Sequence, residues 1–160
     1  MPSTLYGINS KNELTVVKEY QNSFSACYPA WDYFEKKYFN KNVGLEHPEC
    51  WKLGKHDMEM PFEYFTLLST FDGYIFNRAN LSQMISLLEE QSIKTPNLTR
   101  LQMFSDAQKS LNFDTFFITA NSISGYENFI EYHWDEENMV EISPPTLTES
   151  IWDIWEEYVK

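Results

Sequence analysis

The sequence has few of the residues that mark common catalytic or exported proteins. Its two cysteines, Cys27 and Cys50, are too few for a disulfide framework, and we expect both to be reduced thiols. Five glycines leave little room for a phosphate-binding loop, and no Gly-x-Ser-x-Gly or His-Glu-x-x-His motif occurs. A secretory leader is not evident, and no apolar run approaches the roughly 18–20 residues of a membrane span. These absences predict a cytoplasmic protein without a familiar reaction centre.

Basic residues are almost missing from the last third of the chain. The formal net charge is −12, from 12 basic and 24 acidic residues. Residues 1–110 carry a net charge of −2, whereas residues 111–160 carry −10, with Lys160 as their only base. This charge argues against direct binding to nucleic acid or to an anionic membrane, because both ligands require a basic surface. It is compatible with a basic protein partner.

The composition is otherwise that of a folded domain. Hydrophobic residues make up 42% of the 160 residues and aromatic residues 17%. A chain of this length can bury a core of its own without disulfides or metals. We therefore expect one globular domain over residues 1–160, of the α+β class.

The first two-thirds of the chain are predicted to be rich in helices. Leu5–Ile8 can form a short strand, and Ser10–Glu13 has the pattern of a capping box, which predicts a helix to about residue 21. The remaining expected elements are helices at 29–39, from Asn80 and from Thr95, and an irregular segment at 40–60. Residues 62–76 fit either a buried helix or a hairpin around Asp72-Gly73, and we favour the helix.

The last third changes to a β pattern. Residues 113–120 are rich in β-formers, residues 126–134 alternate with a period of two, and residues 139–142 can form a short strand. This pattern predicts a three-stranded antiparallel meander over 112–142, with one face covered by the helices. Ser143-Pro144-Pro145 is expected to end the sheet. A second capping box at Thr146–Glu149 then predicts an amphipathic helix that closes the chain.

The acidic residues of this last third are placed where they do not help the fold. Like charges fall on one face of one predicted strand, and two glutamates lie in the last turn of the predicted helix, where its dipole disfavours them. Uncompensated charge of this kind suits a cationic partner, and a nearby tryptophan could anchor it. The expected partner-binding residues are Glu127, Glu131, Trp134, Asp135, Glu136, Glu137, Asp153, Glu156 and Glu157.

The acidic stretch Glu127–Glu141, the run Asp153–Glu157 and the lack of a reaction centre give the chain a recognisable character. It resembles the small acidic immunity proteins and antitoxins of bacteria, which bind and block a toxin. The resemblance implies a non-catalytic protein without cofactor or metal. It also implies a basic toxin domain as the partner, most plausibly a nuclease, whose active or substrate-binding site would be occluded.

Three other interpretations remain open. The chain could be a phage-type mimic of nucleic acid that blocks a host DNA-binding protein. It could be an enzyme: either a small metal-dependent enzyme that uses His47, Cys50 and His56, or an enzyme in which His133, flanked by Glu131 and Asp135, acts as a general base. It could also be a structural subunit whose acidic helix docks within an assembly.

Overall fold

The chain begins with two strands rather than with a strand and a helix. The structure is a computed structural model that describes residues 3–21, 28–40, 49–68, 74–92, 99–120 and 129–149. Strand β1 (Ser3–Ile8) pairs antiparallel with strand β2 (Leu14–Tyr20). The strand predicted near residues 5–8 is confirmed, whereas the helix predicted to follow it, up to residue 21, is wrong.

The segment that resembled a capping box is the turn between these two strands. The side-chain oxygen of Asn9 accepts hydrogen bonds from the backbone N–H groups of Lys11 and Glu13. Asn12 adopts a left-handed backbone with φ of 63°, which asparagine tolerates better than most residues. The β-branched run Thr15-Val16-Val17 that follows then favours a strand.

These strands belong to a four-stranded antiparallel sheet with the order β2-β1-β4-β3. Strand β3 (Tyr74–Asn77) and strand β4 (Thr115–Ala120) complete it, and β4 lies between β1 and β3. The predicted helix over 62–76 is therefore correct only in part. Helix α2 (Pro61–Leu68) begins at the expected proline, but β3 occupies the end of that segment.

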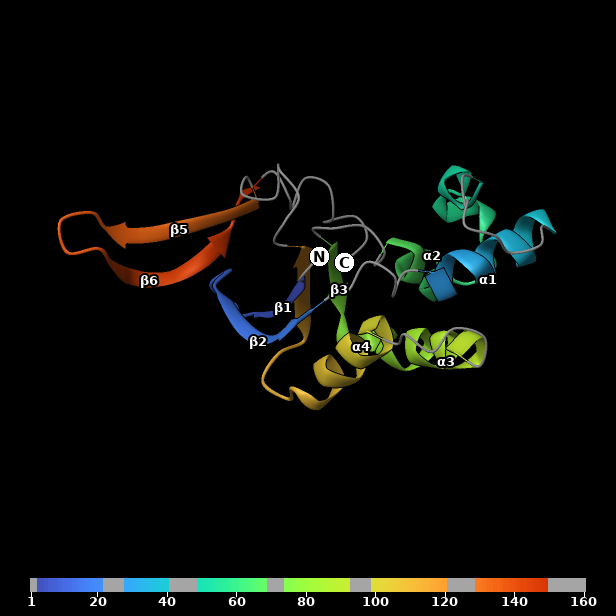
Figure 1. Cartoon of the computed structure of the whole chain (residues 1–160), viewed down its shortest axis with the longest axis horizontal. Helices are drawn as coiled ribbons and strands as arrows, with labels where there is room; N and C mark the ends of the chain where they lie inside the picture. Colours follow the sequence, from blue (N-terminus) through green and yellow to red (C-terminus); the bar gives the residue numbers. More distant parts are fainter. Residues whose placement is uncertain are drawn as a thin grey trace.

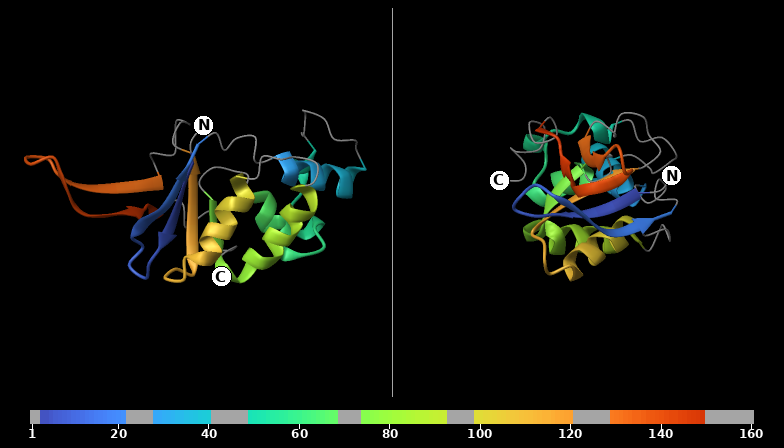
Figure 2. Two further views of the ribbon diagram at one scale, coloured as in Figure 1. Left: turned by 60° about the horizontal axis from the view of Figure 1, so that its bottom comes forward. Right: turned by 90° about the vertical axis from the view of Figure 1, so that its left-hand side faces the viewer.

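Three further helices match the sequence pattern. They are α1 (Tyr28–Phe39), α3 (Leu81–Ser92) and α4 (Thr99–Lys109), and the short 3₁₀ turns are η2 (Cys50–Lys52), η3 (Lys55–Asp57) and η4 (Arg78–Asn80). The expected start of α4 at Thr95 lies outside the described residues. Figure 2 shows these helices on one side of the sheet.

The core lies between this sheet and the helices. Phe76 of β3 packs edge-on against Phe104 of α4, with ring centroids 5.3 Å apart, and stacks on Phe116 of β4 at 5.5 Å. Gly7 of β1 lies beneath the ring of Phe113, where a Cβ atom would come within 2.3 Å of the ring. A glycine is therefore required at this position by contact rather than by backbone conformation.

The last strands do not form the predicted meander. Strand β5 (Ile130–Asp135) pairs with strand β6 (Val140–Leu147) in a separate two-stranded ladder, which we call the hairpin. Strand β4 is not part of it, because β4 pairs with β1 and β3 in the main sheet. The hairpin projects from the side of the sheet opposite the helices (Figure 1 and Figure 2).

Strand β6 also runs through the residues expected to end the sheet. Pro144 and Pro145 lie within it, and Thr146 is a strand residue rather than the cap of a helix. The predicted closing helix falls mostly on residues 150–160, outside the described part of the chain. The α+β class is confirmed, but the predicted layout of helices followed by a meander is wrong. Among the described helices, none is both long and apolar enough to cross a membrane.

Candidate binding surface

The hairpin brings five of the nine predicted partner-binding residues together. They are Glu131, Trp134, Asp135, Glu136 and Glu137. The other four, Glu127, Asp153, Glu156 and Glu157, lie outside the described residues.

The tip of the hairpin is built around Asp135. Its Oδ1 accepts hydrogen bonds from the backbone N–H groups of Glu137 at 3.0 Å and Asn138 at 3.4 Å, and its Oδ2 accepts one from Nδ2 of Asn138 at 2.6 Å. These bonds from Asn138 hold the pKa of the Asp135 carboxyl below its ordinary value. Met139 closes the turn with φ of 54°. Asp135 therefore shapes the tip, and Glu136 and Glu137 present their carboxylates from it.

The strand face that we expected to be buried is open along most of the hairpin. Only Ile130 and Leu147, which face each other at its base, are buried. Tyr132 and Trp134 continue the same alternation, yet they are 52% and 53% exposed. The period of two was read correctly as a strand, but no described element covers these two rings.

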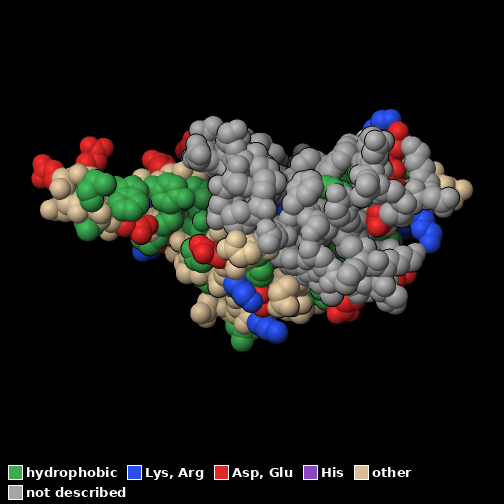
Figure 3. Space-filling model, in the orientation of Figure 1, with side chains coloured by type: hydrophobic (Ala, Val, Ile, Leu, Met, Phe, Trp, Pro, Cys, Tyr) green, Lys and Arg blue, Asp and Glu red, His purple; other side chains and the backbone are tan. Residues whose placement is uncertain are grey.

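Other apolar side chains extend this exposed surface. The described residues include eight large hydrophobic side chains that are exposed, and five of them lie in the hairpin: Tyr132, Trp134, Met139, Val140 and Ile142. Figure 3 shows this apolar surface along the hairpin, with acidic side chains at its free end. Monomeric domains rarely leave apolar side chains gathered in this way without a binding role. Sequence reasoning selected Trp134 but missed the other four, because it placed them in strands of a sheet that the helices were expected to cover.

The charge of the hairpin is entirely negative. Its carboxylates are Glu131, Asp135, Glu136, Glu137 and Glu141, and it contains no lysine or arginine. In the described part of the chain none of these carboxylates forms an ion pair. The ion pairs there are instead in the body of the domain: Lys18–Asp106, Lys37–Glu59, Lys37–Glu63, Lys52–Glu49 and Arg78–Asp114. The negative charge of the body is therefore largely compensated by lysine and arginine, whereas the negative charge of the hairpin is not.

His133 does not have the geometry predicted for a general base. Its Nε2 lies 3.0 Å from Oγ1 of Thr146, on the paired strand. Its described hydrogen-bond partner is thus a hydroxyl and not the carboxylate of Glu131 or Asp135. This contact links β5 to β6.

The structure describes two of the three residues proposed for a metal site, Cys50 and His56. Cys50 is fully buried, and Oε1 of the buried Glu35 accepts hydrogen bonds from the backbone N–H groups of Cys50 at 2.7 Å and Glu49 at 2.8 Å. His56 is exposed, and His47 lies outside the described residues. Within the described ranges, no group of three or more His, Cys, Asp or Glu side chains is arranged to hold a metal ion.

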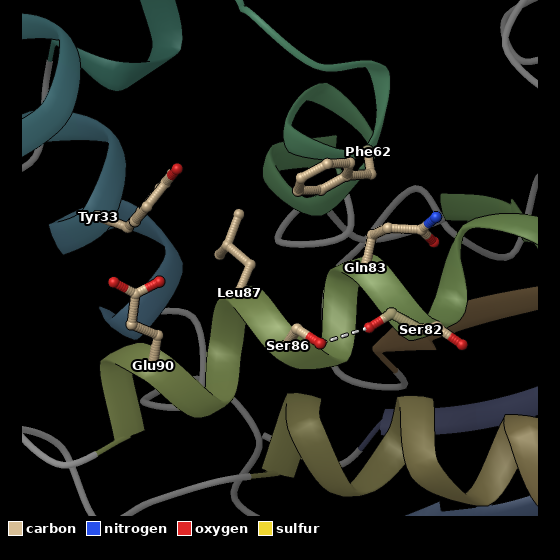
Figure 4. A pocket seen from close by; sticks show the side chains of 7 residues that line it. All are labelled: Tyr33, Phe62, Ser82, Gln83, Ser86, Leu87 and Glu90. Carbon is tan, nitrogen blue, oxygen red and sulfur yellow. Dashed lines mark hydrogen bonds between the residues drawn. The ribbon is translucent and has the colours of Figure 1, made fainter.

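A hollow lies in the helical half, between α1, α2 and α3 (Figure 4). Its lining is Tyr33, Phe62, Ser82, Gln83, Ser86, Leu87 and Glu90. The hydroxyl of Ser86 donates to the backbone carbonyl of Ser82 at 3.0 Å, as serines inside helices commonly do. No base lies within hydrogen-bond distance of either serine hydroxyl among the described contacts. Among the described residues, the hollow therefore shows no hydrogen-bonded nucleophile–base pair of the kind that an acyl-transfer enzyme uses.

Comparisons with protein-family models, with curated proteins and with solved structures gave no match for this chain.

Proposed function

We propose that the chain is a non-catalytic binding protein that engages a basic protein partner through the hairpin. The observation that carries this proposal is the coincidence of two features on one projecting element. The hairpin exposes aromatic and aliphatic side chains, and it carries five carboxylates that have no ion-pair partner among the described residues. Aromatic anchors surrounded by charge are typical of protein interfaces.

The partner that fits best is a basic toxin domain, such as a nuclease. The cleft of a nuclease binds phosphates and is therefore lined by lysine and arginine side chains. A narrow hairpin with Glu136 and Glu137 at its tip is suited to enter such a cleft. The half-exposed ring of Trp134 would supply apolar contact just behind the charged tip. Binding of this kind would exclude the substrate without any chemical step.

The test is to identify the partner and to measure how the hairpin charge affects association. The chain is used to capture proteins from its own cells, and the captured protein is then purified. Association is measured by surface plasmon resonance at low and at high salt. We expect a basic partner whose activity the chain inhibits. Charge reversal by Glu136→Lys with Glu137→Lys should slow association at low salt by about tenfold or more, and less at high salt.

The matched control reverses two exposed acids of the body, Glu90→Lys and Asp114→Lys. It changes the net charge of the chain by the same amount, so it corrects for long-range attraction. We expect it to change the association rate by about twofold or less. Equal effects of the two double variants, or a partner without a basic surface, would exclude the hairpin as the binding element.

A further inference from the structure

Strand β2 is an edge of the four-stranded sheet and runs beside the hairpin. The contact between them is one antiparallel bridge, in which Glu13 faces Thr146. Next to this bridge, the backbone N–H of Leu147 donates to the carbonyl of Asn12 at 3.4 Å, and Nδ2 of Asn12 donates to the carbonyl of Leu147 at 2.7 Å. The main sheet and the hairpin are thus joined at one point and begin to form a common ladder.

That ladder stops because the next donor is missing. Backbone donors alternate in direction along a regular strand, so counting back from Leu147 makes residue 145 the next residue of β6 whose N–H would point toward β2. The pairing of β6 with β5 shifts register just beyond it, between Thr146 and Ser143. The register of the Glu13–Thr146 bridge places this residue opposite Leu14. Residue 145 is a proline and has no N–H to donate. Beyond this point no described strand pairs with the outer edge of β2.

The two strands therefore diverge and leave a groove of about 600 Å³. Its lining includes Tyr6, Val16, Tyr132, Glu141, Ile142 and Pro144. Val16 is 53% exposed on one wall and Ile142 is 69% exposed on the other. The groove thus combines apolar walls with an unpaired strand edge, which is the arrangement that accepts an added strand in β-augmentation.

The charge around the groove indicates what would fill it. Glu141 lines the groove from β6, and Glu19 lies further along β2; neither carboxylate has an ion-pair partner among the described residues. Lys18, the base of β2, is paired with Asp106 at 3.3 Å. A second copy of this chain would bring two acidic edges together, which is unfavourable. A segment with basic side chains compensates them.

We infer that an extended segment of the partner, with alternating apolar and basic residues, adds to the edge of β2 at Leu14–Val16 and fills this groove. This inference rests on the proposed function, since it assigns part of the partner's binding to backbone pairing. The apolar side chains of the segment contact Val16, Tyr132 and Ile142, and its basic side chains face the carboxylates. A bulge in β2 after Val16 limits the straight edge to these three residues.

The test uses a synthetic nonapeptide of alternating lysine and valine as the probe. The control peptide has the same sequence but is N-methylated at every residue, so it keeps the charge and has no backbone N–H with which to form a strand ladder. Binding is measured by fluorescence anisotropy, and backbone pairing by hydrogen exchange of the amides of residues 14–16. We expect N-methylation to weaken binding by about tenfold or more, and the unmodified peptide to slow exchange at those amides.

Two matched variants of the protein locate the peptide. Val16→Lys places a base in the groove, whereas Met60→Lys puts the same base on an apolar residue of the body, outside the groove and the hairpin, that is 49% exposed. We expect the first to weaken binding of the probe by about fivefold or more and the second by about twofold or less. Equal effects of the two variants would overturn the inference.

The remaining outcomes separate this inference from the proposed function. If the N-methylated peptide binds as well as the unmodified one, strand addition is excluded, while charge recognition by the hairpin stands. If the purified partner depends on Glu136 and Glu137 but is unaffected by Val16→Lys, only the groove is excluded. Self-association of the chain that Val16→Lys abolishes would show that a second copy fills the groove, which also overturns the inference.

Discussion

Lys37 of α1 and Glu63 of α2 form an ion pair in which only one member reaches solvent. The Lys37 Nζ lies 2.9 Å from Oε2 of Glu63, whose side chain is 1% exposed. The same oxygen accepts hydrogen bonds from the hydroxyls of Tyr33 and Tyr38, each at 3.0 Å. Burial and these contacts with Glu63 raise the pKa values of both tyrosines. The buried carboxylate of Glu63 thus links α2 to α1 through one ion pair and two tyrosine hydrogen bonds.

Replacing this carboxylate should be costly. We expect Glu63→Gln to lower the free energy of unfolding by about 3 kcal/mol, because Lys37 loses its buried counter-charge and the tyrosine hydroxyls lose an ionised acceptor. Glu59→Gln is the matched control, since Glu59 also lies 3.0 Å from the Lys37 Nζ but is 71% exposed. It should cost less than about 0.5 kcal/mol. Urea unfolding at pH 7 measures both, and equal values would contradict a structural role for the buried pair.

A second polar contact predicts how stability depends on pH. Asp106 of α4 accepts a hydrogen bond from the Tyr20 hydroxyl at 2.6 Å and pairs with Lys18. Burial acts to raise the pKa of the Asp106 carboxyl, but hydrogen bonds from Tyr20, Gln102 and Lys18 outweigh it and lower the pKa overall. A lowered pKa in the folded state stabilises the fold above the unfolded-state pKa of about 4, and this contribution is lost as the pH falls through the folded-state value.

Asp106→Asn removes this titration. We expect the variant to be less stable than the wild type at pH 7, with a difference that shrinks below about pH 4 and disappears once Asp106 is protonated in the wild type. Thermal unfolding followed by circular dichroism from pH 7 to pH 2.5 measures the two curves. Curves that remain parallel over this range would show that the ionised form of Asp106 contributes nothing.

The sequence alone predicted those elements whose pattern of apolar or charged residues depends only on neighbouring positions in the chain. The helices α1 and α3 show apolar residues at helical spacing, and the acidic tip of the hairpin is visible as a run of carboxylates. Strand β2 was missed because Leu14 and Val17 also fit one face of a helix, and only its pairing with β1 decides its state.

Pairing between distant segments could not be predicted. The place of β4 between β1 and β3 depends on residues more than a hundred positions apart, such as Thr4 and Thr119, which no local alternation reveals. The exposure of Tyr132 was missed for the same reason. The alternation around it reports a strand, but whether anything covers that strand is decided by the rest of the fold.

The contact between Gly7 and Phe113 predicts a sharp difference between two glycines. We expect Gly7→Ala to lower stability by about 2–3 kcal/mol, because the added methyl group would overlap the Phe113 ring. Gly54→Ala is the control: its φ is −98°, and an added Cβ would approach Oδ2 of Asp57 no closer than 3.4 Å. It should change stability by about 0.5 kcal/mol or less. Chemical denaturation measures the free energy of unfolding of both variants. A Gly7→Ala variant as stable as the wild type would contradict the contact between Gly7 and Phe113.

Arg78 links the C-terminal end of α4 to the sheet through hydrogen bonds. Its guanidinium donates hydrogen bonds to the backbone carbonyls of Ala107, Gln108, Ser110 and Phe113. We expect Arg78→Lys to cost about 2–4 kcal/mol although the charge is kept, because an ammonium cannot reach four carbonyls in this fork geometry. Asp114→Asn removes the 3.7 Å ion pair of Arg78 with a side chain that is 96% exposed, and should cost under about 0.5 kcal/mol. Urea unfolding measures the free energy of unfolding of both variants. If Asp114→Asn proved more destabilising than Arg78→Lys, Arg78 would act through its charge rather than through its hydrogen bonds to the carbonyls.

Pro145 should decide whether β2 and β6 remain apart. In Pro145→Ala the restored N–H points toward the carbonyl of Leu14, so we expect the ladder to continue and hydrogen exchange in residues 14–16 to slow by about tenfold. Closing the groove should also weaken binding of the lysine–valine peptide. Pro144→Ala is the control, because it removes the neighbouring proline at the same register shift of β6 and leaves residue 145 without a donor, and it should leave both readouts unchanged. Global stability is a poor readout here, since removal of either proline also loosens the unfolded chain. If exchange at residues 14–16 is the same in Pro145→Ala as in the wild type, the missing donor is not what separates the two strands.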